Sequence, residues 1–142
     1  MQLGFYLVTD GAVETALAQI AGKVLENGER LLVVSGDEAQ RDAVAKALWD
    51  AAPPQFLANG ADHPDRQPIL IADHCEPANG AKFIALADGR WRDAAAAFER
   101  GFLFFDEAGR QAARDTYKAL GDRDGVTREF FAREDGRWVK KG

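Results

Sequence analysis

The chain has 142 residues, of which 46% are hydrophobic and 29% are charged, and it carries a formal net charge of −5. This length fits one domain with a sizeable core, and no apolar run is long enough to cross a bilayer. The negative charge argues against nucleic-acid binding by the surface as a whole, because such binding depends on Lys and Arg that neutralise phosphates. Any contact with DNA is therefore expected to be indirect.

The N-terminal sequence and the cysteine content predict where the protein acts. The first residues, MQLGFYLVTDGA, include neither a basic leader nor a long apolar core, so no signal or transit peptide is visible. Cys75 is the only cysteine, which excludes an internal disulfide and fits a reducing compartment. A cytoplasmic location without a membrane partner is expected.

The first half of the chain alternates between apolar runs and amphipathic segments. The turns Thr9-Asp10-Gly11 and Ser35-Gly36-Asp37 each follow an apolar run and open a helix, with Asp10 interpreted as the first cap. The predicted elements are a strand at residues 3–8, a helix that ends at 27–28, a strand at 30–34 and a helix that ends at about residue 50. The side chains expected to face the core are Val13, Leu17, Ile20 and Val24 in the first helix and Ala43, Ala47 and Leu48 in the second.

The second half begins with a long segment, residues 51–67, whose Pro, Gly and polar residues are typical of a surface loop within one domain. The elements predicted after it are strands at residues 68–72, 82–86 and 101–105, a helix from about 91 to 99, and a helix from 106 to 121. The end of the chain is expected to form either a hairpin about Asp135-Gly136 or an appended tail. We take residues 1–121 as a single α/β domain and residues 122–142 as a hairpin or extension of the same domain.

The order of these elements predicts the fold class. Strands alternate with helices through short connections, as they do in βαβ units. The runs LLVV and ILIA are apolar throughout, which is typical of strands covered on both faces. We therefore predict a three-layer α/β domain with a mostly parallel central sheet and helices on both faces.

The loops after the strands carry little recognisable chemistry. The loops after the first two strands contain Gly11 and Gly36 but neither a GxGxxG nor a GxxxxGK[ST] motif. The tetrapeptide DHCE at residues 73–76 offers potential metal ligands, but adjacent residues cannot easily wrap one ion. No cofactor and no metal are therefore expected.

Two other functions stay open. Asp10 and Asp73 follow strands, as do the acidic residues that hold magnesium in phospho-acceptor receiver domains, although a receiver also needs an acidic pair and a Lys that are missing. This alternative is a small nucleotide-binding or receiver-like protein. The other alternative is an enzyme with Cys75 as nucleophile, for which His74 is a poorly placed base because neighbouring side chains point in different directions.

The segment from residue 106 to 121 is the most informative part of the chain. Arg110, Arg114 and Lys118 recur every four residues and form a basic stripe along one helix face. Tyr117 falls beside them at the edge of the apolar seam. An aromatic side chain therefore borders the cations.

Two interpretations of this stripe are open. In the first, Asp106 and Glu107 pair with Arg110 on a solvated face, and the later cations suit the negative end of the helix dipole. In the second, the stripe is a docking site for an acidic peptide with an apolar end. Guanidinium groups then bind carboxylates, and Tyr117 receives the apolar side chain.

A further pair of aromatic residues lies elsewhere in the chain. Trp49 ends the second helix, and Phe56 lies in the loop that follows, where Pro53 and Pro54 stiffen the connection. The two rings either cap the core or form an exposed apolar patch that serves as a protein interface.

Several short motifs, in their order along the chain, resemble one family. They are FYLVTD at the start, ALW followed by a Pro-containing loop with Phe56, QPILIAD, and AARDTYKALG. On these motifs the chain resembles the chi subunits of bacterial DNA polymerase III from Phe5 to Lys118 and, more loosely, to Trp138. The order and spacing of the motifs carry the resemblance, because each motif is short.

The resemblance implies a Rossmann-like domain without a working nucleotide site, which acts as a non-catalytic accessory subunit of the clamp loader. Chi proteins bind the acidic, Phe-ended C-terminal tail of single-stranded DNA-binding protein, and they join the clamp loader through the psi subunit. In some bacteria they also bind a helicase. By position, the residues implied in tail binding are Arg110, Arg114, Tyr117 and the nearby Lys118. The residues implied in binding psi or another partner are Trp49 and Phe56.

Overall fold

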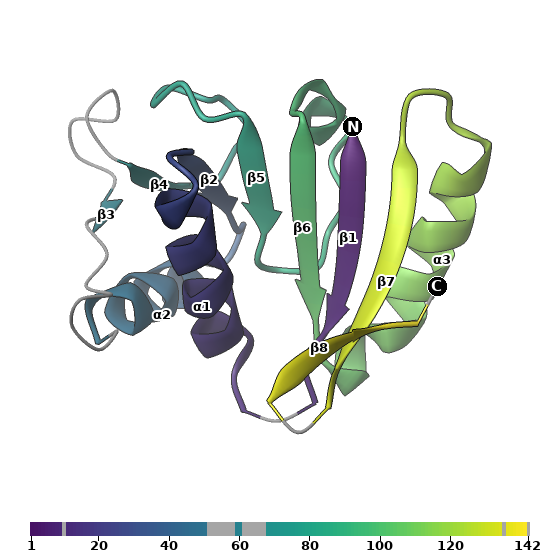
Figure 1. Ribbon diagram of the computed structural model, residues 1–142, viewed down its shortest axis with the longest axis horizontal. Coiled ribbons are helices and arrows are strands. Elements are labelled where there is room, and N and C mark those ends of the chain that lie inside the picture. The colour runs from purple at the N-terminus through teal and green to yellow at the C-terminus, as the bar shows by residue number, and fades with distance from the viewer. Residues whose placement is uncertain (10, 51–58, 61–67, 135, 142) are drawn as a thin grey trace.

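The structure is a computed structural model, and it describes residues 1–9, 11–50, 59–60, 68–134 and 136–141. These residues form one eight-stranded sheet in the order β3-β4-β2-β5-β6-β1-β7-β8 (Figure 1). Neighbouring strands are parallel except for β7 and β8, which are antiparallel. The strands are β1 (Gln2–Leu7), β2 (Leu31–Val34), β3 (Asn59–Gly60), β4 (Ile69–Ala72), β5 (Phe83–Leu86), β6 (Arg100–Phe105), β7 (Thr127–Glu134) and β8 (Arg137–Lys140).

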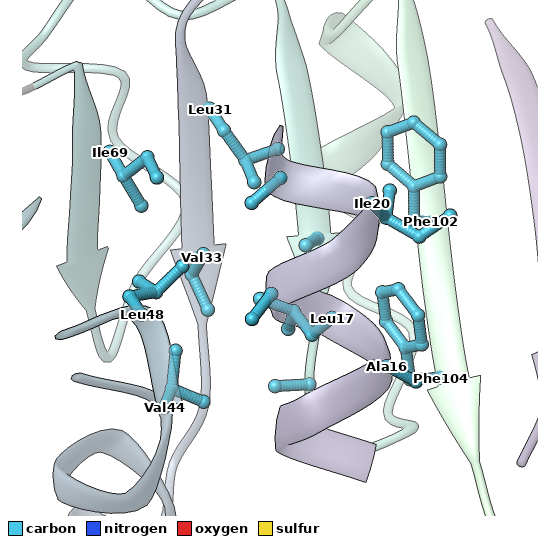
Figure 2. Packing of buried hydrophobic residues seen from close by; sticks show 14 of the residues in the cluster. Ala16, Leu17, Ile20, Leu31, Val33, Val44, Leu48, Ile69, Phe102 and Phe104 are labelled. Atoms are coloured by element: carbon cyan, nitrogen blue, oxygen red, sulfur yellow. The ribbon is translucent and has the colours of Figure 1, made fainter. Parts of the chain in front are cut away.

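Helices cover both faces of the sheet and enclose two separate cores. On one face, α1 (Val13–Glu26) and α2 (Glu38–Trp49) pack on a cluster that includes Phe102 and Phe104 of β6 (Figure 2). On the other face, α3 (Arg110–Ala119) packs on a second cluster, formed by the alternate residues of the same strands. The predicted three-layer α/β fold with a mostly parallel sheet is confirmed, and the arrangement is Rossmann-like.

Strand β2 shows why the central strands are apolar throughout. All four of its residues are fully buried. Leu31 and Val33 face the core under α1 and α2, whereas Leu32 and Val34 face the core under α3. A strand covered on both faces has no position at which a polar side chain would meet water.

Helix α2 follows its prediction at the start and departs from it in the core. The turn predicted to open the helix does so, and Asp37 is its cap, because its side chain accepts hydrogen bonds from two backbone N–H groups of the first turn. The buried residues of the helix are Val44 and Leu48. Of the predicted inner residues, Ala43 and Ala47 are only partly buried, because the helix turns its larger side chains toward the sheet.

Two other helical predictions need correction. Helix α1 has Ala12 at its N-cap and no side-chain cap, while Asp10, the predicted cap, lies outside the described residues. The helix predicted from about residue 91 to 99 is only a short 3₁₀ segment, η2 (Asp93–Ala97). It ends there because Phe98 already has the extended backbone that leads into β6.

The C-terminal segment is part of the sheet. β7 pairs in parallel with β1, and β8 folds back on β7. The turn between them includes Gly136, whose φ of +76° is a conformation that favours glycine. Of the two alternatives for the end of the chain, the structure therefore has the hairpin.

Tyr6 is the centre of an aromatic cluster that joins this hairpin to the sheet. Its ring stacks on Phe131 with 4.9 Å between centroids and on Phe104 with 5.4 Å, and it meets Trp138 edge-on at 5.0 Å. Gly4 lies on the same face of β1, and a Cβ atom there would lie 2.5 Å from the Tyr6 ring. The missing side chain at Gly4 therefore leaves the space that the ring occupies.

We predict that Gly4→Ala lowers the free energy of unfolding by about 1–3 kcal/mol, because the new methyl group displaces a ring that is packed on several others. Urea denaturation measures the change. The matched control is Gly22→Ala in α1, where a Cβ would meet nothing within 4 Å. This control should raise stability by about 0.5–1 kcal/mol, and equal effects of the two substitutions would contradict the explanation.

Candidate functional site

Helix α3 presents an almost entirely polar surface. Ala113 is its one fully buried residue. The helix follows a 3₁₀ segment, η3 (Glu107–Gly109), which Asp106 caps by accepting a hydrogen bond from the N–H of Gly109 at 3.1 Å. The segment predicted as a single helix from 106 to 121 is α-helical only over α3, because both of its ends tighten into 3₁₀ turns.

The basic stripe on α3 has two different parts. Arg110 forms an ion pair with Glu107 at 3.2 Å, as the first interpretation of the stripe predicts. Arg114 and Lys118 are exposed, and within the described part of the chain neither of them forms an ion pair. Their charges are therefore open to an external anion.

Tyr117 is held in place by aromatic and cationic contacts. Its ring meets Phe5 edge-on with 5.2 Å between centroids and lies 6.3 Å from Phe130. The guanidinium of Arg128 lies over the ring, 4.1 Å from its centroid, and donates a short hydrogen bond to the Tyr117 carbonyl oxygen. The absence of a side chain at Gly121 leaves space for this guanidinium, since a Cβ there would lie 3.0 Å from it. The cation–π contact and the hydrogen bond together fix the ring.

A pocket of about 340 Å³ opens beside Tyr117. It is lined by Arg114, Tyr117 and Lys118 from α3, Phe130 from β7, and Lys141, which follows β8. The backbone N–H of Lys141 donates to the carbonyl of Phe130 at 2.7 Å, and its ammonium pairs with Glu134 at 2.6 Å. Aromatic rings and three cations thus line one pocket, which suits a ligand with carboxylates and an apolar end.

A comparison with protein families matches residues 1–127 to the DNA polymerase III chi subunit, HolC. The chain belongs to this family. No curated protein matches it. Chi is an accessory subunit of the polymerase, so the family implies association with the polymerase III complex in a non-catalytic role. In the described residues, no helix of this chi-family chain is long and apolar enough to span a membrane.

The family match covers only part of the pocket. The stripe on α3 lies within the matched residues, whereas Phe130 and Lys141 lie beyond residue 127. Helical periodicity predicts the first group, whereas Phe130 and Lys141 were not predicted from the sequence. The available signal is the period-two pattern of TREFFARE, which places Arg128 and Phe130 on one face of a strand. That pattern points to the pocket only once β7 is known to pair with β1.

Trp49 belongs to a different surface of the chi-family fold. It ends α2, and 54% of its area is exposed. Because α2 and α3 pack on opposite faces of the sheet, Trp49 is not brought into the pocket. Phe56, which was predicted to lie beside it, is outside the described residues.

The carboxyl ends of β2 and β5 are bridged by the protein's own side chains. Asp88, which follows β5, accepts a hydrogen bond from the N–H of Gly36 at 3.0 Å and pairs with Arg92 at 2.7 Å. Burial alone would raise the pKa of Asp88, but the hydrogen bonds and the charge of Arg92 outweigh burial and hold that pKa below its ordinary value. An internal ion pair thus lies at the edge where open α/β sheets usually bind ligands.

The DHCE segment does not form a recognisable site. His74 contacts Asp73 at 2.7 Å and Glu76 at 3.4 Å, and a hydrogen bond donated by its ring to the Asp73 carboxylate raises the pKa of His74. Among the residues that the structure describes, no group of three His, Cys, Asp or Glu could hold a metal. Burial raises the pKa of the Cys75 thiol, which disfavours the thiolate that a nucleophile needs.

We predict that Asp88→Asn destabilises the protein by about 1.5–3 kcal/mol at neutral pH, because Arg92 and the Gly36 N–H lose a charged acceptor. Since the folded-state pKa of Asp88 is lowered, its contribution is fully present above the ordinary Asp pKa of 3.8 and is lost as the pH falls through the folded-state value. Denaturant unfolding of both proteins from pH 7 to pH 3 measures the difference. If the difference in the free energy of unfolding between the two proteins stayed constant from pH 7 to pH 3, the stabilising role of ionised Asp88 would be contradicted.

Proposed function

We propose that this chi-family chain is a non-catalytic adaptor of the polymerase III clamp loader that binds the acidic C-terminal tail of single-stranded DNA-binding protein. The observation that carries the proposal is the pocket on α3, in which Tyr117 and Phe130 lie beside the cations of Arg114, Lys118 and Lys141. The adaptor acts in the cytoplasm and contacts DNA only through its partners. A net charge of −5 fits indirect contact better than phosphate binding.

Each part of the ligand has a counterpart in the pocket. The terminal Phe ring packs on Tyr117 and Phe130, in the offset or edge-on geometry that aromatic pairs prefer. The α-carboxylate and the preceding acidic side chains bind Arg114 and Lys118, which no carboxylate of the described residues engages. Arg110 is held by Glu107, so we expect it to contribute less than Arg114 and Lys118.

The size of these interactions predicts a weak complex. Two charge-assisted hydrogen bonds contribute about 1.5–3 kcal/mol each, and burial of one aromatic ring contributes about 1.5–3 kcal/mol. The loss of translational, rotational and side-chain freedom offsets a large part of this sum. A dissociation constant in the micromolar range, about −8 kcal/mol, is therefore expected.

The link to the clamp loader uses a second surface, on the far side of the sheet. Trp49 is exposed at the end of α2, and large exposed aromatics are enriched at protein interfaces. We assign this residue, with Phe56, to the interface with psi or with another partner such as a helicase. Because α2 and α3 cover opposite faces, both partners could bind the same chain at once.

The tail-binding site is tested by titrating the protein with a peptide that is acidic and ends in Phe. We expect micromolar binding that weakens with added salt and falls about tenfold or more in Arg114→Ala, because a charge-assisted contact is lost. Arg110→Ala should change the affinity by less than about threefold, since Glu107 already engages that side chain.

The matched control for this titration is Arg90→Ala, which removes one exposed cation from the turn after β5 and should leave the affinity unchanged. If Arg90→Ala and Arg114→Ala lowered the peptide affinity equally, binding would depend on the overall charge of the protein and not on the pocket. Absence of binding at tens of micromolar would refute the tail-binding function.

The second surface is tested by capture of purified clamp-loader subunits on the immobilised protein. Trp49→Ala should abolish capture and leave the peptide affinity unchanged, because truncating a central aromatic contact typically removes more than about 2 kcal/mol of binding energy. Arg114→Ala should show the reverse pattern. Capture that survives Trp49→Ala would exclude this surface.

A further inference from the structure

The terminal hairpin divides its charged side chains between two faces. Along β7, Phe130 and Ala132 face the core under α3, and the alternation of a strand places Glu134 on the same side. Glu129 and Phe131 lie on the other side, where Phe131 packs on the core under α1 and α2. Two carboxylates of one strand thus lie on opposite faces of the sheet.

Each of these carboxylates pairs with a lysine near the end of the chain. Glu134 pairs with Lys141 at 2.6 Å, and the two side chains are 52% and 44% exposed. Glu129 pairs with Lys140 at 3.3 Å. Of these two lysines, Lys141 lines the pocket beside Tyr117 and Lys140 does not. The two ion pairs are therefore chemically alike, but one lies at the pocket and the other does not.

We propose that Glu134 is an internal competitor of the acidic ligand, and that it sets the affinity of the pocket by occupying the ammonium group of Lys141. This inference rests on the proposed function, because it takes the ligand to be the acidic tail. The backbone of Lys141 is fixed to Phe130, so its side chain stays at the pocket whichever carboxylate it pairs with. A ligand carboxylate that reaches Lys141 must displace Glu134.

The exchange is easy to reverse because both members of the pair are about half exposed. Exposed ion pairs are weak and are screened by salt. The competitor therefore tunes the affinity without closing the site, and its removal should strengthen peptide binding about two- to fivefold. Arg114 and Lys118 have no such competitor among the described residues, so they provide the first contacts with the ligand.

The test compares Glu134→Gln with Glu129→Gln in the same peptide titration at low salt. Both substitutions are nearly isosteric, and both change the net charge from −5 to −4. Glu134→Gln should tighten binding about two- to fivefold, whereas Glu129→Gln should leave it unchanged. In a Lys141→Gln background, which itself binds more weakly, Glu134→Gln should have no effect.

The outcomes separate this inference from the function on which it rests. If the unmodified protein fails to bind the peptide, the proposed function is wrong and the competitor has nothing to compete with. If the unmodified protein binds and Arg114→Ala weakens binding, but Glu134→Gln matches Glu129→Gln, only the inference about Glu134 is overturned. A gain that persists in the Lys141→Gln background would also overturn it.

Discussion

The parallel pairing of β1 with β7 is the constraint on which the candidate site depends. Because β1 lies between β6 and β7 in the sheet, the chain must cross over β1 on its way from β6 to β7, and α3 makes this crossing (Figure 1). The register sets Phe5 opposite Phe130, and both rings then meet Tyr117. A one-residue slip would turn Phe130 to the other face and dismantle the aromatic lining.

The electrostatics of the site are local and oppose the charge of the whole protein. The chain is acidic overall, yet among the described residues the cations of the stripe and the pocket that pair with a carboxylate are Arg110, with Glu107, and Lys141, with Glu134. Arg114 and Lys118 are left between them. Because screening limits interactions between exposed charges to about 8 Å at physiological salt, distant carboxylates cannot cancel this local positive charge. An acidic protein can therefore attract an acidic peptide.

The sequence was sufficient for the local features and insufficient for the non-local ones. The three-layer fold and the stripe on α3 follow from hydrophobic periodicity and from helix geometry. Arg128, Phe130 and Lys141 could not be found in this way, since their place depends on the pairing of β1 with β7, whose partner residues are 125 positions apart in the chain. One short alanine-rich segment was predicted wrongly as an α-helix. Residues 93–97 form a 3₁₀ helix, because Phe98 is already extended and leads into β6. The partner surface at Trp49 stays a prediction from the family resemblance.

The strand ends show how such a fold can serve as an adaptor. In open α/β sheets the crevice at the carboxyl ends of the strands is the usual ligand site, but here Asp88 joins the ends of β5 and β2 through Gly36 and Arg92. The ion pair stabilises the sheet at the edge that other proteins leave open. In the proposed function, recognition therefore uses the outer surfaces, the α3 pocket on one face and the end of α2 on the other. A rigid sheet between them keeps these surfaces apart, which is the geometry that a bridge between two proteins requires.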